Sequence, residues 1–209
     1  MMKTALLAAA ATMLCSAAAA NAATLTFEGT PNTAYSASIT RNGVVISNPA
    51  GQDQHFHELD SSLFPAELPS NGTGVLFEDR DTQIQLALAT NGLFTLGNFD
   101  TAALIASGND AGGTTRLRVT SFLANQQVAQ ANFAINSSSY ITYNGAGLGM
   151  FDRVVFDGIN GGGGFVLDNV NVTAAAVPET ATWGMMIAGF GVMGAAMRTR
   201  RRSTKVSFA

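Results

Sequence analysis

The chain has 209 residues and a formal net charge of −3, with 47% hydrophobic and only 12% charged residues. The segment 23–176 carries thirteen acids, five arginines and no lysine, and therefore has a formal charge of −8. An acidic surface of this kind repels phosphate backbones, which excludes a nucleic-acid-binding protein.

Residues 1–22 have the organisation of a secretory signal peptide. Lys3 precedes a run rich in alanine and leucine, and the run ends on Ala20-Asn21-Ala22, an A-x-A cleavage sequence. Cleavage after Ala22 also removes Cys15, the one cysteine of the sequence, so the exported chain would form no disulfide. Its stability would then come from packing or from a bound metal.

Residues 23–176 predict a single all-β domain, because this length suits one hydrophobic core. The pattern consists of short alternating runs separated by Asn/Gly turns, with one clear hairpin at 38–46 around Asn42-Gly43. Helical spacing occurs only over a short stretch, 101–105. Many short strands of this kind favour a two-sheet β-sandwich with a jelly-roll-like arrangement. The further strands are expected at 24–28, 83–88, 116–123, 128–135, 151–156 and 165–173.

One carboxylate lies within an apolar alternation. In the expected strand at 165–173, Asp168 alternates in phase with Val166, Val170 and Val172, which places it on their face. A carboxylate buried on an apolar face needs a partner, since leaving it unpaired costs several kcal/mol or forces its protonation. An arginine, backbone hydrogen bonds or a metal ion would each satisfy it.

The two ends of the domain resemble carbohydrate-binding modules of the jelly-roll type. The resemblance rests on Leu25-Thr26-Phe27-Glu28-Gly29 at the start and on Leu167-Asp168-Asn169-Val170 at the end. In that family the first and last strands lie side by side and bind a structural calcium ion. The resemblance implies that Glu28 and Asp168 are calcium ligands, and carboxylate oxygens are what Ca²⁺ prefers.

A second acidic segment carries two histidines. Asp53, His55 and His57 would lie on one face of a strand, with Glu58 and Asp60 close by, and such a set can hold a transition metal. His-x-His is common by chance, and a nearby proline and glycine indicate a loop. We therefore favour polar strand or loop residues here.

Catalysis is not expected from this sequence. It has no G-x-S-x-G nucleophile elbow, and after export it has no thiol. Aromatic residues that could stack sugars are few, and Tyr140 and Tyr143 are the candidates for glycan binding. The function favoured is a non-enzymatic surface or matrix protein that binds exopolysaccharide. A purely structural matrix component is the alternative, and a glycan-active enzyme is less favoured.

The C-terminal region predicts a membrane-anchored tail. Residues 182–197 contain no charge and would form a helix of about 24 Å, against a bilayer core of about 30 Å. The run predicts a transmembrane helix at 182–197, and the positive-inside rule predicts that the tail at 203–209 is cytoplasmic. A buried helix with a basic end is the alternative. The cations that follow the apolar run are Arg198, Arg200, Arg201 and Arg202.

The segment 177–202 resembles the PEP-CTERM sorting signal in its tryptophan-containing variant. The residues that carry the resemblance are Val177, Pro178, Glu179 and Trp183, followed by a double methionine, a glycine-rich apolar run and the arginine cluster. The sequence departs from the pattern at Thr180, where a second proline is usual, and in the residues that follow the arginines.

This resemblance implies a route to the cell surface. Its bearers come from Gram-negative bacteria that usually make exopolysaccharide, and an exosortase-type membrane protease recognises the tail in the inner membrane. Cleavage near Pro178-Glu179 would release the protein to the cell surface or the extracellular matrix. We therefore expect a transient membrane anchor with a cytoplasmic C-terminus.

Processing at both ends can be tested by intact mass spectrometry of the protein released by the host. We expect a species that begins at Ala23 and lacks Arg198, Arg200, Arg201 and Arg202. A released protein that still contains the arginine cluster would contradict processing near Pro178.

Overall fold

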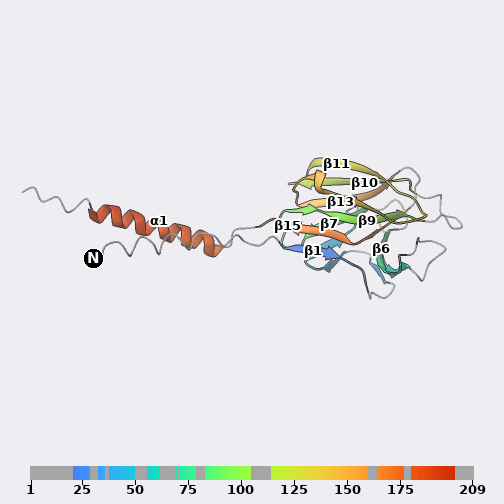
Figure 1. The fold of residues 1–209 in the computed structure, drawn as a ribbon, viewed down its shortest axis with the longest axis horizontal. Coiled ribbons are helices and arrows are strands. Elements are labelled where there is room, and N and C mark those ends of the chain that lie inside the picture. The colour runs from blue at the N-terminus through green and yellow to red at the C-terminus, as the bar shows by residue number, and fades with distance from the viewer. Residues whose placement is uncertain are drawn as a thin grey trace, which may run out of the picture. The chain divides into compact units, whose positions relative to one another are not determined.

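The structure is a computed structural model, and Figure 1 shows its ribbon. It describes residues 21–28, 33–35, 38–49, 56–61, 69, 71–78, 83–104, 114–159, 164–176 and 180–200. Residues 21–175 form one compact unit, and the helix α1 (Thr180–Arg200) belongs to a separate one.

The compact unit is built from three antiparallel sheets, two large and one small (Figure 1). Sheet I has the strand order β11 (Gln126–Ala134), β10 (Arg116–Leu123), β13 (Arg153–Ile159), β7 (Gln83–Leu88), β4 (Val44–Ser47) and β3 (Ser38–Arg41). Sheet II has the order β12 (Ile141–Asn144), β9 (Asn98–Ala103), β14 (Phe165–Asp168), β6 (Gly74–Glu78), β5 (Phe56–Asp60) and β2 (Thr33–Tyr35). Sheet III has the order β1 (Ala22–Leu25), β15 (Val170–Ala174) and β8 (Phe94–Leu96). A short 3₁₀ helix, η2 (Ala146–Leu148), precedes β13.

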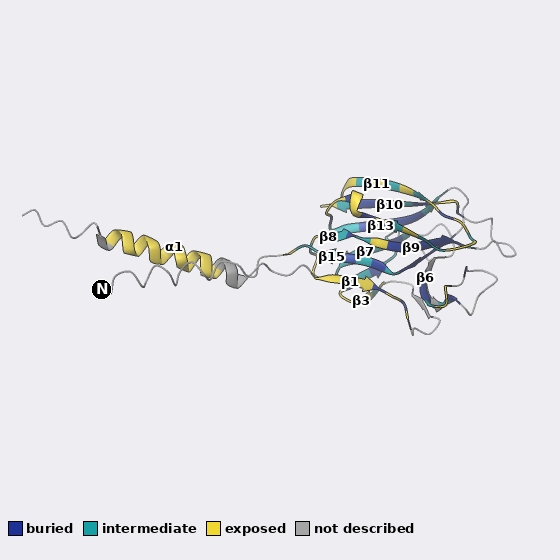
Figure 2. Cartoon of the chain, in the orientation of Figure 1, coloured by how far each residue is buried: buried dark blue, intermediate teal, exposed yellow. Residues whose placement is uncertain are grey.

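The core lies between sheets I and II and is made by every second residue of their strands. Ile84 and Leu86 of β7 point into it from sheet I, and Phe99 of β9 points into it from sheet II. The Phe99 ring meets Phe156 edge-on at 5.5 Å and Phe133 at 5.4 Å between ring centroids. The inner strands are accordingly buried, whereas β11 is largely exposed (Figure 2). The predicted all-β sandwich is confirmed, and sheet III is an addition to it.

Two hairpin turns use residues with positive φ. Asn42 and Gly43 have φ of 48° and 77° and join β3 to β4, as the sequence predicted. The turn between β10 and β11 lies at Ala124 and Asn125, with φ of 49° and 64°, so β11 begins earlier than the predicted 128.

The last predicted strand is in fact two strands. Asn169, with φ of 48°, interrupts the run at 165–173, so that β14 pairs within sheet II and β15 within sheet III. The prediction that Asp168 shares a face with Val170 and Val172 was therefore wrong. These two valines belong to the main core, whereas Val166 belongs to a second small apolar cluster on the other face of sheet II.

The stretch with helical spacing at 101–105 is also extended as far as the structure describes it. β9 runs through Ala103 and pairs with β12 on one side and β14 on the other. Two ladders of backbone hydrogen bonds outweigh a weak local preference for helix. The expected neighbourhood of the first and last strands is present, since β1 pairs with β15 and Leu25 lies opposite Val170.

Helix α1 spans the predicted helix at 182–197, and its described side chains, Gly184–Arg198, are exposed. Among the described residues, no helix is long and apolar enough to cross a membrane, which differs from the predicted transmembrane helix. Three predicted segments lie outside the described residues: the signal peptide through residue 20, Val177 to Glu179, and Arg201 to Ala209. The side chains of Trp183 and Arg200 lie outside them as well.

A substitution at Gly74 tests how closely the start of β6 approaches the segment that follows β1. A Cβ at this buried position would lie 1.9 Å from the carbonyl oxygen of Phe27. Gly74→Ala should therefore cost about 1–3 kcal/mol of unfolding free energy or more, because backbone has to move. Denaturant unfolding measures this cost. Gly147→Ala is the matched control, because a Cβ there meets nothing within 4 Å. Equal stability of both variants would contradict the close approach.

Candidate functional site

The Asp168 carboxylate is buried and held by hydrogen-bond donors from three residues. Its Oδ2 accepts from Asn71 Nδ2 at 2.9 Å and from Thr73 Oγ1 at 2.9 Å, and its Oδ1 accepts from the Asn169 backbone N–H at 2.7 Å. Asn71 is oriented in turn, because its Oδ1 accepts from Ser61 Oγ and from the Thr73 N–H. Asp168 thus ties the end of β14 to the segment that precedes β6.

Glu28 lies next to this hydrogen-bond network and is exposed. Its Oε2 accepts from the Gly74 N–H at 3.5 Å, so Glu28 and Asp168 contact adjacent residues of one segment. Burial raises the pKa of Asp168 above its ordinary 3.8, the hydrogen bonds lower it, and the charge of Glu28 adds to the rise. Two carboxylates that repel each other beside amide and hydroxyl oxygens fit Ca²⁺ in chemistry.

The described residues contain no group of three or more histidine, cysteine, aspartate or glutamate side chains that could hold a metal ion. The hydrogen bonds to Asp168 correspond to one of the alternatives that the sequence left open. Calcium at Glu28 and Asp168 therefore stays a prediction.

Tyr140 lies beside this network on the outer side of sheet II. It packs on the small cluster of Val75, Ala102 and Val166, and its hydroxyl is buried without a hydrogen-bond partner among the described residues. Burial raises the pKa of Tyr140, and the charges of Asp168 and Asp100 raise it further. The hydroxyl therefore stays protonated.

Tyr143 has a different environment, although it is only three residues away. Its ring packs against Phe133 at 4.8 Å and belongs to the edge of the main core, and its hydroxyl donates to the Ala134 carbonyl. Tyr140 and Tyr143 contact different apolar clusters, so they do not form one stacking platform. Glycan binding by either ring stays a prediction.

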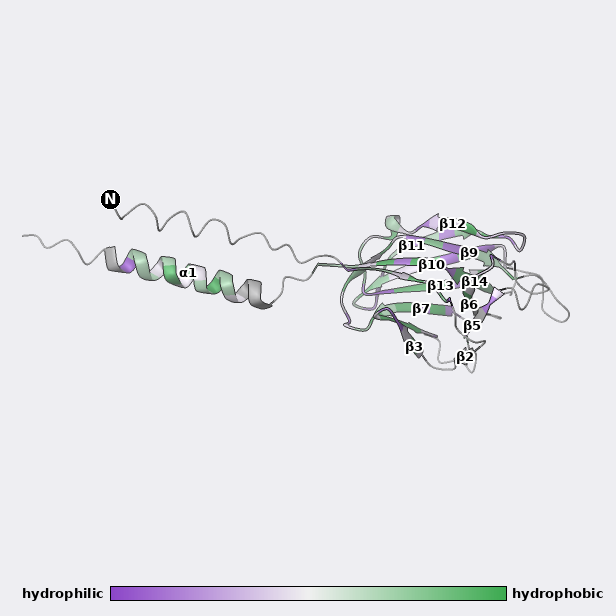
Figure 3. Cartoon of the chain, turned by 60° about the horizontal axis from the view of Figure 1, so that its bottom comes forward, coloured by the Kyte–Doolittle hydropathy of each residue, from purple (hydrophilic) through white to green (hydrophobic). Residues whose placement is uncertain are grey.

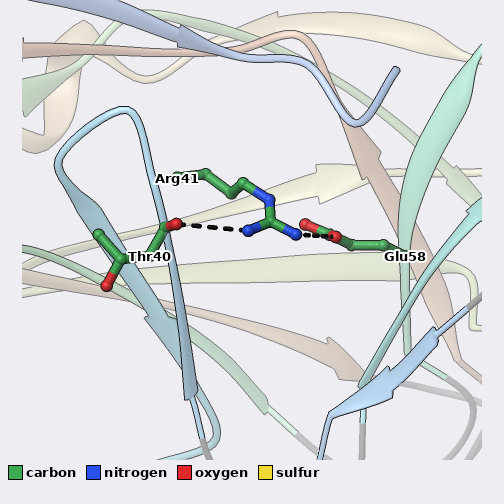
Figure 4. A network of polar contacts seen from close by, with 3 residues as sticks. All are labelled: Thr40, Arg41 and Glu58. Carbon is green, nitrogen blue, oxygen red and sulfur yellow. Dashed lines mark hydrogen bonds and ion pairs between the residues drawn. The ribbon is translucent and has the colours of Figure 1, made fainter. Parts of the chain in front are cut away.

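The acidic segment with two histidines does not bring its described side chains together on one face. Asp53 and His55 lie outside the described residues, whereas His57 and Glu58 are neighbours on β5 and so point to opposite faces. Glu58 is fully buried between the sheets and accepts from Arg41 Nη2 at 2.6 Å, while Arg41 Nη1 donates to the Thr40 carbonyl (Figure 4). The side chain of Glu58 thus serves an ion pair between β3 and β5.

The outer face of sheet I carries a row of linked polar side chains. Gln85 Nε2 donates to Ser47 Oγ at 3.3 Å, and Arg153 Nη1 donates to Gln85 Oε1 at 3.3 Å. The Arg153 guanidinium lies over the Phe122 ring at 4.2 Å from its centroid. These four residues, which we call the polar ladder, come from the adjacent strands β4, β7, β13 and β10.

The same face carries more polar side chains beside the ladder. Arg118 of β10 is paired with Asp157 of β13, and the Arg118 side chain is 39% exposed. Arg116 and Asn132 are exposed at the same face. Figure 3 shows hydrophilic and hydrophobic residues interspersed along the strands of the sandwich. The outer face of sheet I therefore presents amides, hydroxyls and guanidinium groups.

The sequence prediction missed this surface, although its signal was present. The runs whose alternate residues predicted the core also name the outward residues, such as Gln83 and Gln85 or Arg116 and Arg118. Alternation does not say which strands are neighbours, so it could not bring Gln85 and Arg153 together.

The sequence matches no protein-family model and no curated protein. A cyclase from Fischerella sp. TAU is similar in structure, with 15% identity, a TM-score of 0.46 and coverage of 76% of this chain and 100% of that chain.

Carbohydrate-binding modules are also among the similar structures. A family 29 module from Piromyces equi has 15% identity and a TM-score of 0.40, and covers 75% of this chain and 92% of its own. A fucose-binding module from Streptococcus pneumoniae has 13% identity and a TM-score of 0.38, and covers 73% of this chain and 96% of its own.

The role of Asp168 can be tested by replacement and calcium together. Asp168→Ala leaves the Asn71 and Thr73 donors without their acceptor and should cost about 1–3 kcal/mol of unfolding free energy for each donor that stays buried. Thr73→Val is the milder comparison, because Asp168 keeps its other donors.

Thermal unfolding of the wild type and of Asp168→Ala, each with calcium and with chelator, separates the role of Asp168 as a hydrogen-bond acceptor from a role as a calcium ligand. If calcium binds, the wild type melts higher with calcium and the variant does not respond. An unchanged wild-type melting temperature would remove the calcium site.

Proposed function

We propose that this chain is an exported, non-enzymatic protein that binds polysaccharide through the outer face of sheet I. The observation that carries the proposal is the polar ladder, which links four adjacent strands on the outer face of sheet I. Its amide, hydroxyl and guanidinium groups offer donors and acceptors at fixed positions, which is the chemistry that recognises sugar hydroxyls.

The ladder is held rigidly before any ligand binds. The Gln85 amide is oriented at both ends by Ser47 and Arg153, and the Arg153 guanidinium is fixed by Gln85 and by the Phe122 ring. Arg153 uses one of its five N–H donors in these contacts, so the others remain for a ligand. Side chains that are already ordered lose less entropy on binding.

Export and processing are part of the proposal and are supported by the sequence. Residues 1–22 have the organisation of a signal peptide, and the segment 177–202 resembles a PEP-CTERM sorting signal. An exosortase-type protease would be the processing partner, and the cell surface or matrix the destination. Exopolysaccharide is the polymer that the protein would meet there.

A structural matrix component is the second candidate, and strand β11 favours it. Among the described strands, β11 pairs only with β10, and its nine residues include neither a charge nor a proline. An uncharged edge strand of this length is a template for pairing with another chain. Val128 on this strand is 53% exposed.

Co-sedimentation of the purified protein with exopolysaccharide from its host tests the proposal. We expect saturable retention, and we expect Gln85→Ala to weaken it by about threefold to tenfold, as for lost neutral hydrogen bonds. Gln126→Ala is the matched control. Gln126 pairs with Leu123 and so lies on the opposite side of the sheet from Phe122.

The remaining outcomes separate the alternatives. Retention that is lost in Tyr140→Ala or Tyr143→Ala but kept in Gln85→Ala would move the site away from sheet I. No retention with calcium or with chelator would contradict glycan binding. Sedimentation of the protein alone, increasing with its concentration, would favour the structural role.

A further inference from the structure

We infer that the ligand of the outer face of sheet I is an acidic polysaccharide, whose carboxylates are bound by Arg153 and Arg116. This inference rests on the proposed function, because it names the chemical class of the ligand at the same surface. It is carried by the distribution of charge on the described residues and by the geometry of the two arginines.

The outer face of sheet I has the opposite charge to the domain as a whole. Residues 23–176 have thirteen acids and five arginines, yet the described outward residues of sheet I include three arginines and one acid. Arg118 is neutralised by Asp157. Arg116 and Arg153 have no ion pair among the described residues, so the face presents two uncompensated cations.

Arg153 is prepared for a planar anion. The guanidinium carbon lies over the Phe122 ring at 4.2 Å from its centroid, and Gln85 Oε1 accepts from Nη1, so the group is held by two neighbours. A guanidinium can bind a carboxylate through two parallel N–H donors, which makes a strong and directional contact. A neutral sugar would leave this charge without a partner.

Arg153 and Arg116 lie at two separate positions along the direction of strands β10 and β13. Arg153 lies opposite Phe122 on β10, and Arg116 is six residues from Phe122 on the same face. At about 3.3 Å per residue, the two positions are about 20 Å apart. Thr120 and Val155, which lie between them, are buried.

This separation favours a polymer over a single sugar. A chain lying along β10 and β13 would meet Arg153 first, then the Arg118–Asp157 pair and then Arg116. Repeated carboxylates on an extended polysaccharide can engage both ends at once, and the second contact benefits from the first. The described face carries no lysine, and two arginines about 20 Å apart suit carboxylates spaced along a sugar chain better than the closely spaced phosphates of nucleic acid.

Affinity electrophoresis in native gels tests the inference, with polygalacturonate as the probe and the fully methyl-esterified polymer as its neutral control. We expect the wild type to be retarded by polygalacturonate and not by the ester, and the retardation to weaken with added salt. Arg153→Gln should weaken binding by about tenfold or more, and Arg116→Gln should weaken it further in combination.

Two further variants separate the effect of the planar, paired N–H donors of the guanidinium from the effect of net charge. Arg153→Lys keeps the charge and loses the planar fork, so it should bind between the wild type and Arg153→Gln. Gln126→Glu makes the same change of net charge on the opposite side of the sheet and should bind as the wild type does. All variants are compared only after their melting temperatures match that of the wild type.

Three results would overturn the inference. These are equal retardation by the acid and the ester, unchanged binding in the double variant, and stronger retardation by single-stranded DNA than by polygalacturonate at equal ionic strength. If the host exopolysaccharide still retains the wild type in these cases, the proposed function stands and only the ligand class is wrong. If neither polymer retains it, both fail.

Discussion

Burial of alternate side chains between two six-stranded sheets is the interaction on which the rest of this structure depends. The domain has no cysteine after residue 22, so no covalent link supports it, and the core aromatic residues supply much of the apolar contact. Because a strand has a period of two, the inward positions of β10, β13 and β7 also fix their outward positions. The polar ladder is therefore a direct consequence of the core.

The two polar features inside the sandwich have distinct structural roles. Arg41 and Glu58 join β3 of one large sheet to β5 of the other, with Glu58 fully buried. An ion pair with one buried member adds little net stability, but removing Arg41 would leave the buried Glu58 charge uncompensated. Asp168 instead joins the end of β14 to Asn71 and Thr73, where the chain turns from one sheet to another at Asn169.

Much of the fold could be predicted from the sequence because its signals are local. The alternation at Gln83–Leu88 and the Asn42-Gly43 turn each depend on a few neighbouring residues, and both are present in the structure. Asn169 was missed because asparagine adopts positive φ only where the surroundings demand it, and nothing in the adjacent apolar run indicates this. The different environments of Tyr140 and Tyr143 depend on which strands pack beside them. The location of the polar ladder depends on strand order, which no local pattern specifies.

The position of β14 and β15 has a consequence for how the chain reaches its final form. β14 lies between β9 and β6 in sheet II, and β15 lies between β1 and β8 in sheet III, yet both come after all the other strands in the sequence. Sheet II therefore cannot be completed until residue 168 has emerged from the ribosome, and sheet III cannot be completed until residue 174 has emerged. An incomplete chain would expose the unpaired edges of β9 and β6, which invite aggregation and proteolysis.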